Sequence, residues 1–413
     1  MVRIERTRLR DLMYPLLAGL RIVDITTIVL GPFATQILGD LGAEVIKIET
    51  IGGDMNRAIP PHGAPGIGPA FANNNRNKRS LAVDLKQEAG KEVLRRLIAT
   101  SDALVHNMRQ PALDRLGFSW EAVHAVNPRL VYCAALGYGS DGPYAGKPAY
   151  DDIIQAAGGL AGLNQVRDGE PAYHPTVTAD KVAALYVVYA VLAALLHRER
   201  TGGEGQLVEM PMFEAMAGFV LNEHLMGATF AADGSTGYHR ALSRNRKPYR
   251  TADGWIAVLP YTAVQWSRAL KIVGRQDVCA AAWFSDNAQR SLRSDELYGI
   301  LATSLGGRTS SQWLEIFERE DIPCGPINTP DALLRDPHLE AVGFFEPHFD
   351  TATPVQRTLR QPVLYRGVVR EADRMAPPLG ADTASLLEDL GYARDAIARL
   401  GSAGAIAGPE PEP

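Results

Sequence analysis

The sequence predicts an α/β protein with an open, Rossmann-like parallel sheet in a large domain and a second, smaller α+β domain. The apolar run Leu20–Asp24 has the length of a buried strand. Gly31 and Pro32 then open a helix that Gly42 ends, and Glu44–Glu49 alternates like a strand. Strand, helix and strand follow one another within about thirty residues, which is the size of one βαβ unit.

The same alternation continues along the chain, as in a parallel sheet covered by helices. In such sheets ligands bind beyond the carboxyl ends of the strands. The further strands and helices predicted in this part cover residues 80–85, 87–99, 103–107, 111–116, 130–136, 151–159, 182–200, 206–210 and 213–227.

Composition shifts divide the chain into three predicted parts. Residues 1–227 form the first part of the large domain, 228–325 form the small domain, and 326–413 return to the large domain. A Gly- and Ser-containing linker, 232–237, lies near the first boundary. The elements predicted after this linker are strands over 255–259 and 363–365 and helices over 264–273, 285–305, 310–319 and 382–390, the last being the final helix.

Bulk composition excludes several function classes. The chain has 413 residues, 46% of them hydrophobic, and a net charge of −5 without a basic patch, so we expect no nucleic-acid partner. Three distant cysteines make neither a metal motif nor a disulfide framework, as in a protein of the reducing cytoplasm. The apolar run after Lys181 is interpreted as a core helix, and no membrane span or signal peptide is expected.

Cofactor motifs are missing from the expected places. No G-x-G-x-x-G follows the first strand, and Pro32 has no N–H to offer a pyrophosphate. The sequence also lacks a P-loop, a nucleophile-elbow motif and the zinc motif H-E-x-x-H. We therefore expect no permanently bound cofactor and no metal.

Asp180 is the most informative residue. It closes the polar stretch His174–Asp180, and the apolar run Val182–Leu196 follows almost directly. This places a carboxylate at or near the first turn of a buried helix, where free N–H groups and the helix dipole favour negative charge. Such a carboxylate can be a helix cap or a covalent nucleophile, and the local sequence leaves both interpretations open.

A series of motifs resembles the class III CoA-transferases, the family of formyl-CoA and carnitine CoA-transferases, which is related to the α-methylacyl-CoA racemases. The resemblance covers roughly residues 16–395, and its motifs occur in the family's order. The segments that carry it are GPFATQILGDLGAEVIKIE from Gly31, NRNKRSLAVDL from Asn75, NMRQPALDRLGFSW from Asn107, GYGSDGPYAGKPAY from Gly137, HRERTGGEG from His197, TADGWI from Thr251 and PPLGADT from Pro377.

This resemblance implies that Asp180 is the catalytic nucleophile of an acyl-CoA:carboxylate CoA-transferase. The carboxylate would attack the thioester of an acyl-CoA and pass through a mixed anhydride and an aspartyl-CoA thioester before the acceptor acid enters. Coenzyme A and acyl-CoA are then substrates, with a carboxylic acid as the second partner. The family also implies an interlocked homodimer.

Two alternatives remain open. A racemase or epimerase of acyl-CoA esters would share the fold, but the racemases carry histidine where this chain has Tyr150, and tyrosine is a poor base at neutral pH. In a non-catalytic CoA-binding protein, Asp180 would only cap its helix.

By resemblance, Lys78, Asn107 and Arg115, with Arg76 nearby, are expected to bind CoA, and Tyr150 is expected to contact the substrate acid. Val29 replaces a glutamine of the formyl-CoA transferases near the acyl group, which disfavours formate and oxalate as substrates. The front of the chain is more similar to family members that transfer CoA among dicarboxylic acids such as succinate. The residues predicted to hold a second carboxylate are His174 and Arg246, together with Arg109, Arg240 and Arg244.

Overall fold

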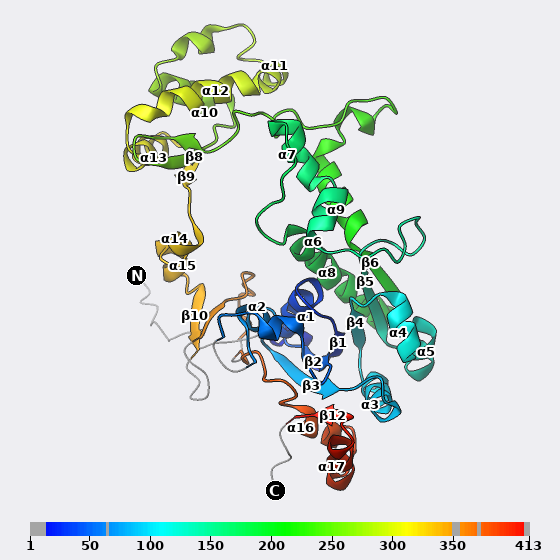
Figure 1. The fold of residues 1–413 in the computed structure, drawn as a ribbon. Coiled ribbons are helices and arrows are strands. Elements are labelled where there is room, and N and C mark those ends of the chain that lie inside the picture. Colours follow the sequence, from blue (N-terminus) through cyan, green and yellow to red (C-terminus); the bar gives the residue numbers. More distant parts are fainter. Residues whose placement is uncertain (1–13, 63–65, 349–355, 370–372, 409–413) are drawn as a thin grey trace. The chain divides into compact units, whose positions relative to one another are not determined.

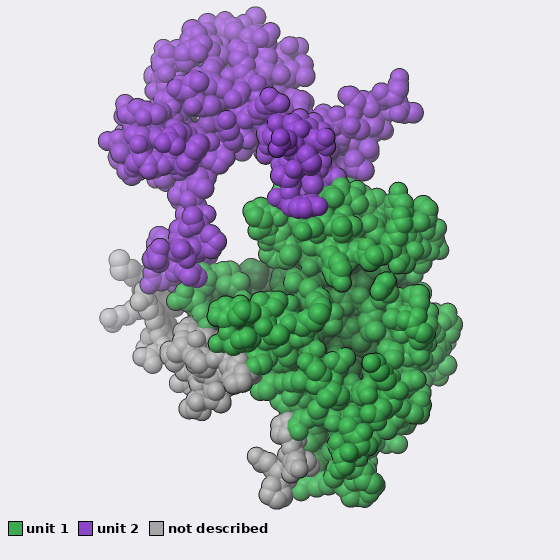
Figure 2. Space-filling view, in the orientation of Figure 1, with its two compact units in different colours: residues 1–158, 174–217, 342–413 green, residues 159–173, 218–341 purple. Residues whose placement is uncertain are grey.

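The computed structural model describes residues 14–62, 66–348, 356–369 and 373–408, and the chain divides into two compact units (Figures 1 and 2). Unit 1 comprises residues 1–158, 174–217 and 342–413, and unit 2 comprises residues 159–173 and 218–341. The predicted small domain, 228–325, lies within unit 2, which also takes segments on either side of it and the separate stretch 159–173.

A seven-stranded sheet forms the centre of unit 1, with the strand order β12-β3-β2-β1-β4-β5-β6 (Figure 1). Every neighbouring pair is parallel except β12 with β3, which confirms the predicted α/β fold with a mostly parallel sheet. The strand order changes direction between β1 and β4, which is where open sheets of this kind bind ligands. The strands are β1 Arg21–Ile25, β2 Glu44–Glu49, β3 Lys78–Val83, β4 Ala103–His106, β5 Val131–Leu136, β6 Leu207–Pro211 and β12 Ile406–Ala407.

Helices pack against this sheet because their apolar faces meet its buried side chains. Val23, Ile46 and Leu104 of the strands are fully buried and pack with Leu94 and Leu97 of α3. The helices of unit 1 are η1 Pro15–Leu17, α1 Leu30–Asp40, η2 Met55–Ala58, α2 Pro69–Ala72, α3 Glu88–Ala99, α4 Gln110–Leu116, α5 Trp120–Val126, α6 Asp151–Ala157, α8 Thr178–Thr201, α16 Thr383–Asp389 and α17 Arg394–Ser402. The strands β10 Phe345–His348 and β11 Gln356–Leu359 form an antiparallel pair, and α9 Met212–His224 runs from unit 1 into unit 2.

The longest helix, α8, is apolar enough to cross a membrane by length and composition, and half of its most apolar window is buried inside the protein. It packs against α1, α6 and the strands β5 and β6. A core helix of a soluble protein passes the same test, so this finding is weak evidence for a membrane.

Unit 2 contains a three-stranded antiparallel sheet, in the order β7-β8-β9, and a set of short helices. Its core includes the buried aromatic residues Trp266, Tyr298, Trp313 and Phe317. The elements of this unit are α7 Leu160–Asp168, η3 Met226–Thr229, β7 Tyr249–Arg250, β8 Trp255–Val258, α10 Ala263–Ile272, η4 Gln276–Ala280, α11 Asn287–Leu292, α12 Ser294–Ser304, η5 Leu305–Gly307, α13 Ser310–Arg319, β9 Cys324–Pro326, α14 Pro330–Leu333 and α15 Pro337–Ala341.

Three predicted elements differ from the structure. The single helix over 285–305 is wrong, because Asp286 caps α11 through the N–H groups of Ala288 and Gln289 and the chain leaves the helix at Arg293 before α12 begins. The strand over 363–365 is wrong, since these residues form no strand and the side chains of Val363 and Leu364 are about half exposed. Helix α16 is not the final one, because α17 follows it.

Candidate active site

Asp180 lines a cavity of about 250 Å³ at the carboxyl edge of the sheet in unit 1. The cavity lies where the strand order changes direction, since it is bordered by residues that follow β1 and β4 and by the end of β5. We call it the Asp180 cavity. Its lining consists of Thr27, Ile28, Val29, Leu30, Met55, Asn107, Arg109, Ala135, Gly137, Pro148, Ala149, Tyr150, Asp180 and Met212.

Asp180 is the third residue of α8, and the N-cap position belongs to Val177, which makes no side-chain capping bond. The Asp180 side chain therefore does not occupy the cap position. Its carboxylate forms no hydrogen bond or ion pair with any residue in the described ranges. Burial, and to a smaller extent the nearby Asp151 carboxylate, raise the pKa of Asp180 to about 7.

The first turn of α8 is fixed from α6. The Asp180 backbone N–H donates to Asp151 Oδ1 over 3.0 Å, and Asp151 Oδ2 accepts from Gln155 Nε2 over 2.6 Å. Gln155 also holds the segment before α8, because its Oε1 accepts from the His174 N–H over 2.8 Å and its Nε2 donates to the Thr176 carbonyl over 3.2 Å. Two residues of α6 thus position the carboxylate of Asp180 without bonding to it.

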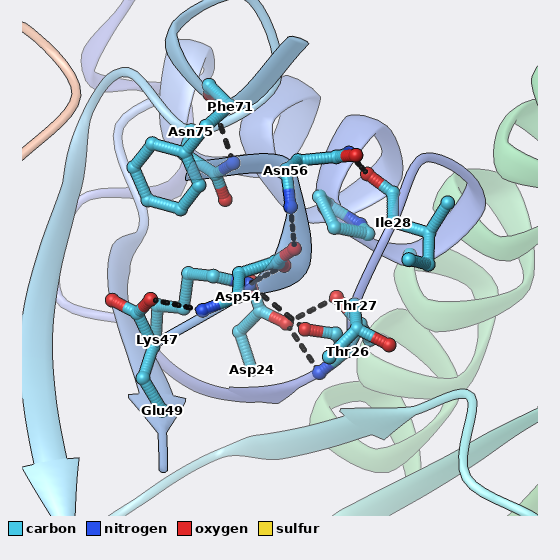
Figure 3. A network of polar contacts seen from close by, with 12 residues as sticks. Asp24, Thr26, Thr27, Ile28, Lys47, Glu49, Asp54, Asn56, Phe71 and Asn75 are labelled. Carbon is cyan, nitrogen blue, oxygen red and sulfur yellow. Dashed lines mark hydrogen bonds and ion pairs between the residues drawn. The ribbon is translucent and has the colours of Figure 1, made fainter. Parts of the chain in front are cut away.

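The turn after β1 also lines the cavity, and it is held by side chains of β1, β2 and η2 (Figure 3) and by Asn107, which follows β4. Asp24 accepts from the Thr26 N–H, Lys47 donates to the Thr26 carbonyl and Asn56 donates to the Ile28 carbonyl. Asn107 bonds both the N–H and the carbonyl of Thr27, over 3.0 and 2.8 Å.

Ile28 in this turn has a φ of +74°, in the left-handed region that a β-branched residue rarely adopts. Strain of this kind persists where surrounding contacts determine the backbone, and it is common at functional sites. A side chain at Gly31 would overlap Thr26, so the second residue of α1 must be glycine.

A second cavity, of about 370 Å³, also opens at the carboxyl edge, over β1, β2 and β3. Apolar and charged groups line it together, and its exposed basic residue is Lys86 at the end of the predicted strand 80–85. We call it the β1–β3 cavity. Its lining consists of Ile25, Thr26, Thr27, Lys47, Ile48, Glu49, Thr50, Gly53, Asp54, Val83, Asp84, Leu85, Lys86, Met108 and Leu116.

Two of the predicted CoA-binding residues are buried in ion pairs. Lys78 Nζ donates to Asp24 Oδ2, the Pro32 carbonyl and Asn75 Oδ1, at 2.8 to 2.9 Å, so all three ammonium protons are used. Arg76 forms a bidentate pair with Asp40. A contact from Lys78 or Arg76 to a phosphate of CoA would have to displace one of these bonds. Neither residue lines the Asp180 cavity or the β1–β3 cavity.

The other two predicted CoA-binding residues are accessible. Asn107 lines the Asp180 cavity, although both ends of its amide already bond Thr27. Arg115 lies on the exposed surface of α4, one residue before Leu116 of the β1–β3 cavity.

The residues predicted to contact the acid substrate do not all line the Asp180 cavity, and Arg240 and Arg244 belong to unit 2. Tyr150, which is 68% exposed, and Val29 both line the Asp180 cavity. His174 is exposed and is absent from the lining, while Arg246 belongs to unit 2. Arg109 is in the lining and forms no ion pair with the described residues, so its guanidinium is available to an anion.

Three residues of the two cavities and their supports, Asp151, Gln155 and Lys86, are not among the site residues predicted from the sequence. Asp151 and Gln155 are four residues apart on a predicted helix, a spacing that puts both side chains on one face. Lys86 follows a predicted strand, and residues at that position reach the ligand-binding edge of the sheet. Both features can be seen in the sequence, but they do not indicate a role in the site until the positions of α6 and of the strand ends are known.

Comparison with known proteins identifies the family. The family model described as "CoA-transferase family III" matches residues 17–383. The chain belongs to CoA-transferase family III. The resemblance drawn from the motifs is therefore confirmed, and with it the expectation of an enzyme that transfers CoA between carboxylic acids.

Curated relatives of this transferase have dicarboxylic acids in their names. It is 30% identical over 393 residues to the succinate–glutarate CoA-transferase of Agrobacterium fabrum, covering 91% of this chain and 96% of that protein. It is 29% identical over 396 residues to the human succinyl-CoA:glutarate CoA-transferase, covering 94% and 90% of the two chains. Among solved structures, a CaiB/BaiF family protein from Brucella suis superposes with a TM-score of 0.77 at 30% identity, over 91% of this chain and 99% of that one.

Proposed function

We propose that this transferase uses Asp180 as a covalent nucleophile and moves CoA between dicarboxylic acids. The observation that carries the proposal is the Asp180 carboxylate itself, which is partly buried, lacks a bonding partner among the described residues and lines a cavity at the sheet's switch point. A carboxylate that makes no structural bond and has a perturbed pKa in a cavity is a functional candidate.

Four steps follow from this arrangement. An Asp180 oxygen attacks the thioester carbonyl of the donor acyl-CoA, the C–S bond breaks, and a mixed anhydride and the CoA thiolate result. The thiolate attacks the aspartyl carbonyl, which releases the donor acid as a carboxylate and leaves an aspartyl-CoA thioester. The acceptor carboxylate attacks this thioester and expels the thiolate. The thiolate then attacks the acceptor's acyl carbon, which yields the new acyl-CoA and restores the Asp180 carboxylate.

Oxyanions form in each of these steps and need hydrogen-bond donors. Two amides close to Asp180 are already used, because the Asp180 N–H donates to Asp151 and the Lys181 N–H donates to the Val177 carbonyl. The amides of Ile28 and Val29 are better candidates, because both residues line the cavity and their N–H groups have no acceptor among the described residues. The strained turn at Ile28 would then serve to present these two donors.

CoA binding is assigned to the β1–β3 cavity. Thr27 borders both cavities, so a ligand in the β1–β3 cavity can extend to Asp180. Lys86, and Arg115 near its rim, offer charges for the phosphates of CoA. Lys78 and Arg76 support the strands beneath and act on CoA indirectly.

Dicarboxylates are the proposed acids because the lining offers Arg109 without an ion-pair partner among the described residues. A guanidinium can bind the second carboxylate of such an acid in a bidentate fashion while the first reacts at Asp180. The names of the curated relatives, with succinate and glutarate among them, support the same class.

The active form is proposed to be an interlocked homodimer in the cytoplasm. Light scattering of the purified protein tests the dimer, and mixing of two tagged forms tests the interlocking, because threaded subunits exchange only after unfolding. A monomer of 44.7 kDa with full activity would contradict the dimer.

The chemistry is tested by mass spectrometry after incubation with succinyl-CoA and other acyl-CoA donors and trapping with hydroxylamine or borohydride. A modification mapped to Asp180 and missing in Asp180→Asn is expected. Exchange of the α-proton of an acyl-CoA without an adduct would instead indicate a racemase. Neither adduct nor exchange with any donor would reject the covalent mechanism.

A further inference from the structure

We propose that unit 2 carries a separate binding site for a small organic carboxylate. A cavity of about 210 Å³ lies among α10, α11 and α12 and the loop that precedes β7. Pockets for drug-sized ligands begin at roughly 300 Å³, so this one suits a short acid. We call it the Arg290 cavity, and its lining consists of Tyr238, Arg240, Tyr261, Trp266, Asn287, Arg290, Ser291, Ser294, Leu297 and Tyr298.

Two guanidinium groups line this cavity without a carboxylate partner among the described residues. Arg290 is 7% exposed, and its Nη1 and Nη2 donate to the Phe284 carbonyl and to Asn287 Oδ1, over 2.7 and 2.8 Å. Arg240 donates from Nε to the Tyr298 hydroxyl over 2.7 Å, and its guanidinium lies over the Tyr261 ring at 4.5 Å. All of these acceptors are neutral.

Two buried arginines in unit 1, unlike Arg290, form ion pairs with carboxylates. Arg57 pairs with Glu49 over 2.7 Å, and Arg198 pairs with Asp102 over 2.9 Å. An arginine buried without an opposite charge is costly, because the guanidinium loses its hydration and gains no anion in exchange. The Arg290 cavity therefore holds positive charge that a bound anion would balance.

Three further buried side chains contribute donors that no described residue accepts. The Ser294 hydroxyl and the Trp266 indole N–H make no hydrogen bond within the described ranges, although the two residues are only 5% and 3% exposed. The fully buried Tyr298 hydroxyl accepts from Arg240 and donates to no described residue. Since an indole N–H can only donate, the missing partner must be an acceptor. A carboxylate supplies acceptors and no donor.

Neighbouring carboxylates do not fill this role. Asp295 accepts from the Ser243 hydroxyl over 2.6 Å and from Asn245, and Asp286 caps α11. Neither lines the cavity. The aromatic rings of Tyr238, Tyr261 and Trp266 give the lining an apolar side, which favours an acid with a carbon skeleton over inorganic phosphate.

The test is calorimetric titration of the full chain with sodium succinate and, separately, sodium benzoate. Arg240→Gln removes one guanidinium, and Trp266→Phe removes the indole N–H while keeping an aromatic ring. Each is expected to weaken binding of the acid, by about 10-fold or more for Arg240→Gln, because a hydrogen-bonded charge is lost. Arg319→Gln is the matched control, since this exposed arginine of the same unit pairs with Glu315, does not line the cavity and should leave binding unchanged.

A second comparison separates this site from the Asp180 cavity. Binding that survives in Arg109→Gln and is lost in Arg240→Gln assigns the acid to unit 2, whether or not Asp180 proves to be the nucleophile. Binding lost in Arg109→Gln and unchanged in both unit 2 variants would overturn the proposal. The proposal of a carboxylate site in unit 2 would also be wrong if the wild type bound neither succinate nor benzoate at millimolar concentration. Tighter binding of phosphate than of either acid would contradict it as well.

Discussion

Asp24 and Asp180 lie at the carboxyl edge of the same sheet and differ in burial, in hydrogen-bond partners and in pKa. Asp24 is fully buried, and its two oxygens accept from Thr26, Thr35 and Lys78. Burial opposes its ionisation, but Lys78 and Lys47 outweigh this effect and hold the pKa of Asp24 at about 2. Asp180 has no such partners among the described residues, and burial raises its pKa to about 7.

This difference distinguishes a carboxylate with a structural role from one that can react. A carboxylate whose lone pairs are all engaged fixes the shape of the turn beside it and has no electron pair to offer a substrate. A carboxylate that the fold leaves without partners is destabilised and nucleophilic, and it is the one that can react. Four experiments test this difference between the two aspartates.

The largest effect is expected from Asp180→Asn. The amide cannot attack a thioester, so kcat/KM should fall by about 10⁴-fold or more, as for the loss of other covalent nucleophiles. Steady-state CoA transfer from succinyl-CoA to a dicarboxylate measures it. A variant that kept more than a tenth of the activity would remove Asp180 from the covalent role.

Lys78→Met should mainly affect stability. It leaves Asp24 buried without its nearest cation, which costs roughly 3–5 kcal/mol in the free energy of unfolding. Urea denaturation at neutral pH measures the change. Arg399→Met is the control, because this exposed arginine of α17 pairs with the exposed Asp395 and should leave the free energy of unfolding almost unchanged. Equal effects of the two variants would mean that the buried pair is not structural.

Asp180→Asn should also change how stability depends on pH. Because the pKa of Asp180 is raised in the folded state, the native protein binds more protons than the unfolded chain between about pH 4 and 7. Wild-type stability is thus penalised progressively as pH rises through this window. The variant should be equally stable near pH 4 and more stable at pH 8, on the order of 2 kcal/mol after allowing for solvent screening. Thermal unfolding at both pH values shows whether the difference grows with pH.

Asp151→Asn gives the smallest expected change. The amide oxygen can still accept the Asp180 N–H, but the negative charge that helps raise the pKa of Asp180 is gone. The acid limb of the kcat/KM–pH profile should shift down by up to about one pH unit, while burial keeps the midpoint above the usual value for aspartate. A shift toward higher pH would show that Asp151 does not act by its charge.

Much of the fold was predictable because local signals agreed with the tertiary structure. Strand Glu44–Glu49 has the same bounds in the structure, and the helix after Pro32 ends before Gly42, whose φ is +98°. The break between α11 and α12 was not predictable from the sequence. Residues that favour a helix continue across Arg293, and the Asp286 cap affects only the start of α11. Asp180 was predictable from the change in polarity ahead of an apolar helix.

The roles of Lys78 and Asp24 required the structure. A lysine in a polar segment and an aspartate at the end of a strand give no sign in the sequence that they meet, since they are 54 positions apart. The pairing depends on β3 lying two strands away from β1 in the sheet order. For the same reason the donors of the Arg290 cavity could not be recognised, because α10, α11, α12 and the loop before β7 supply them separately.

The short strand β12 pairs antiparallel with β3 at the border of the sheet. During synthesis, β3 is made more than 300 residues before residues 406–407 arrive, so its outer backbone groups stay open while most of the chain emerges. An uncovered strand edge invites pairing with another chain. The nascent protein therefore depends on a late, two-residue strand to protect this edge against aggregation.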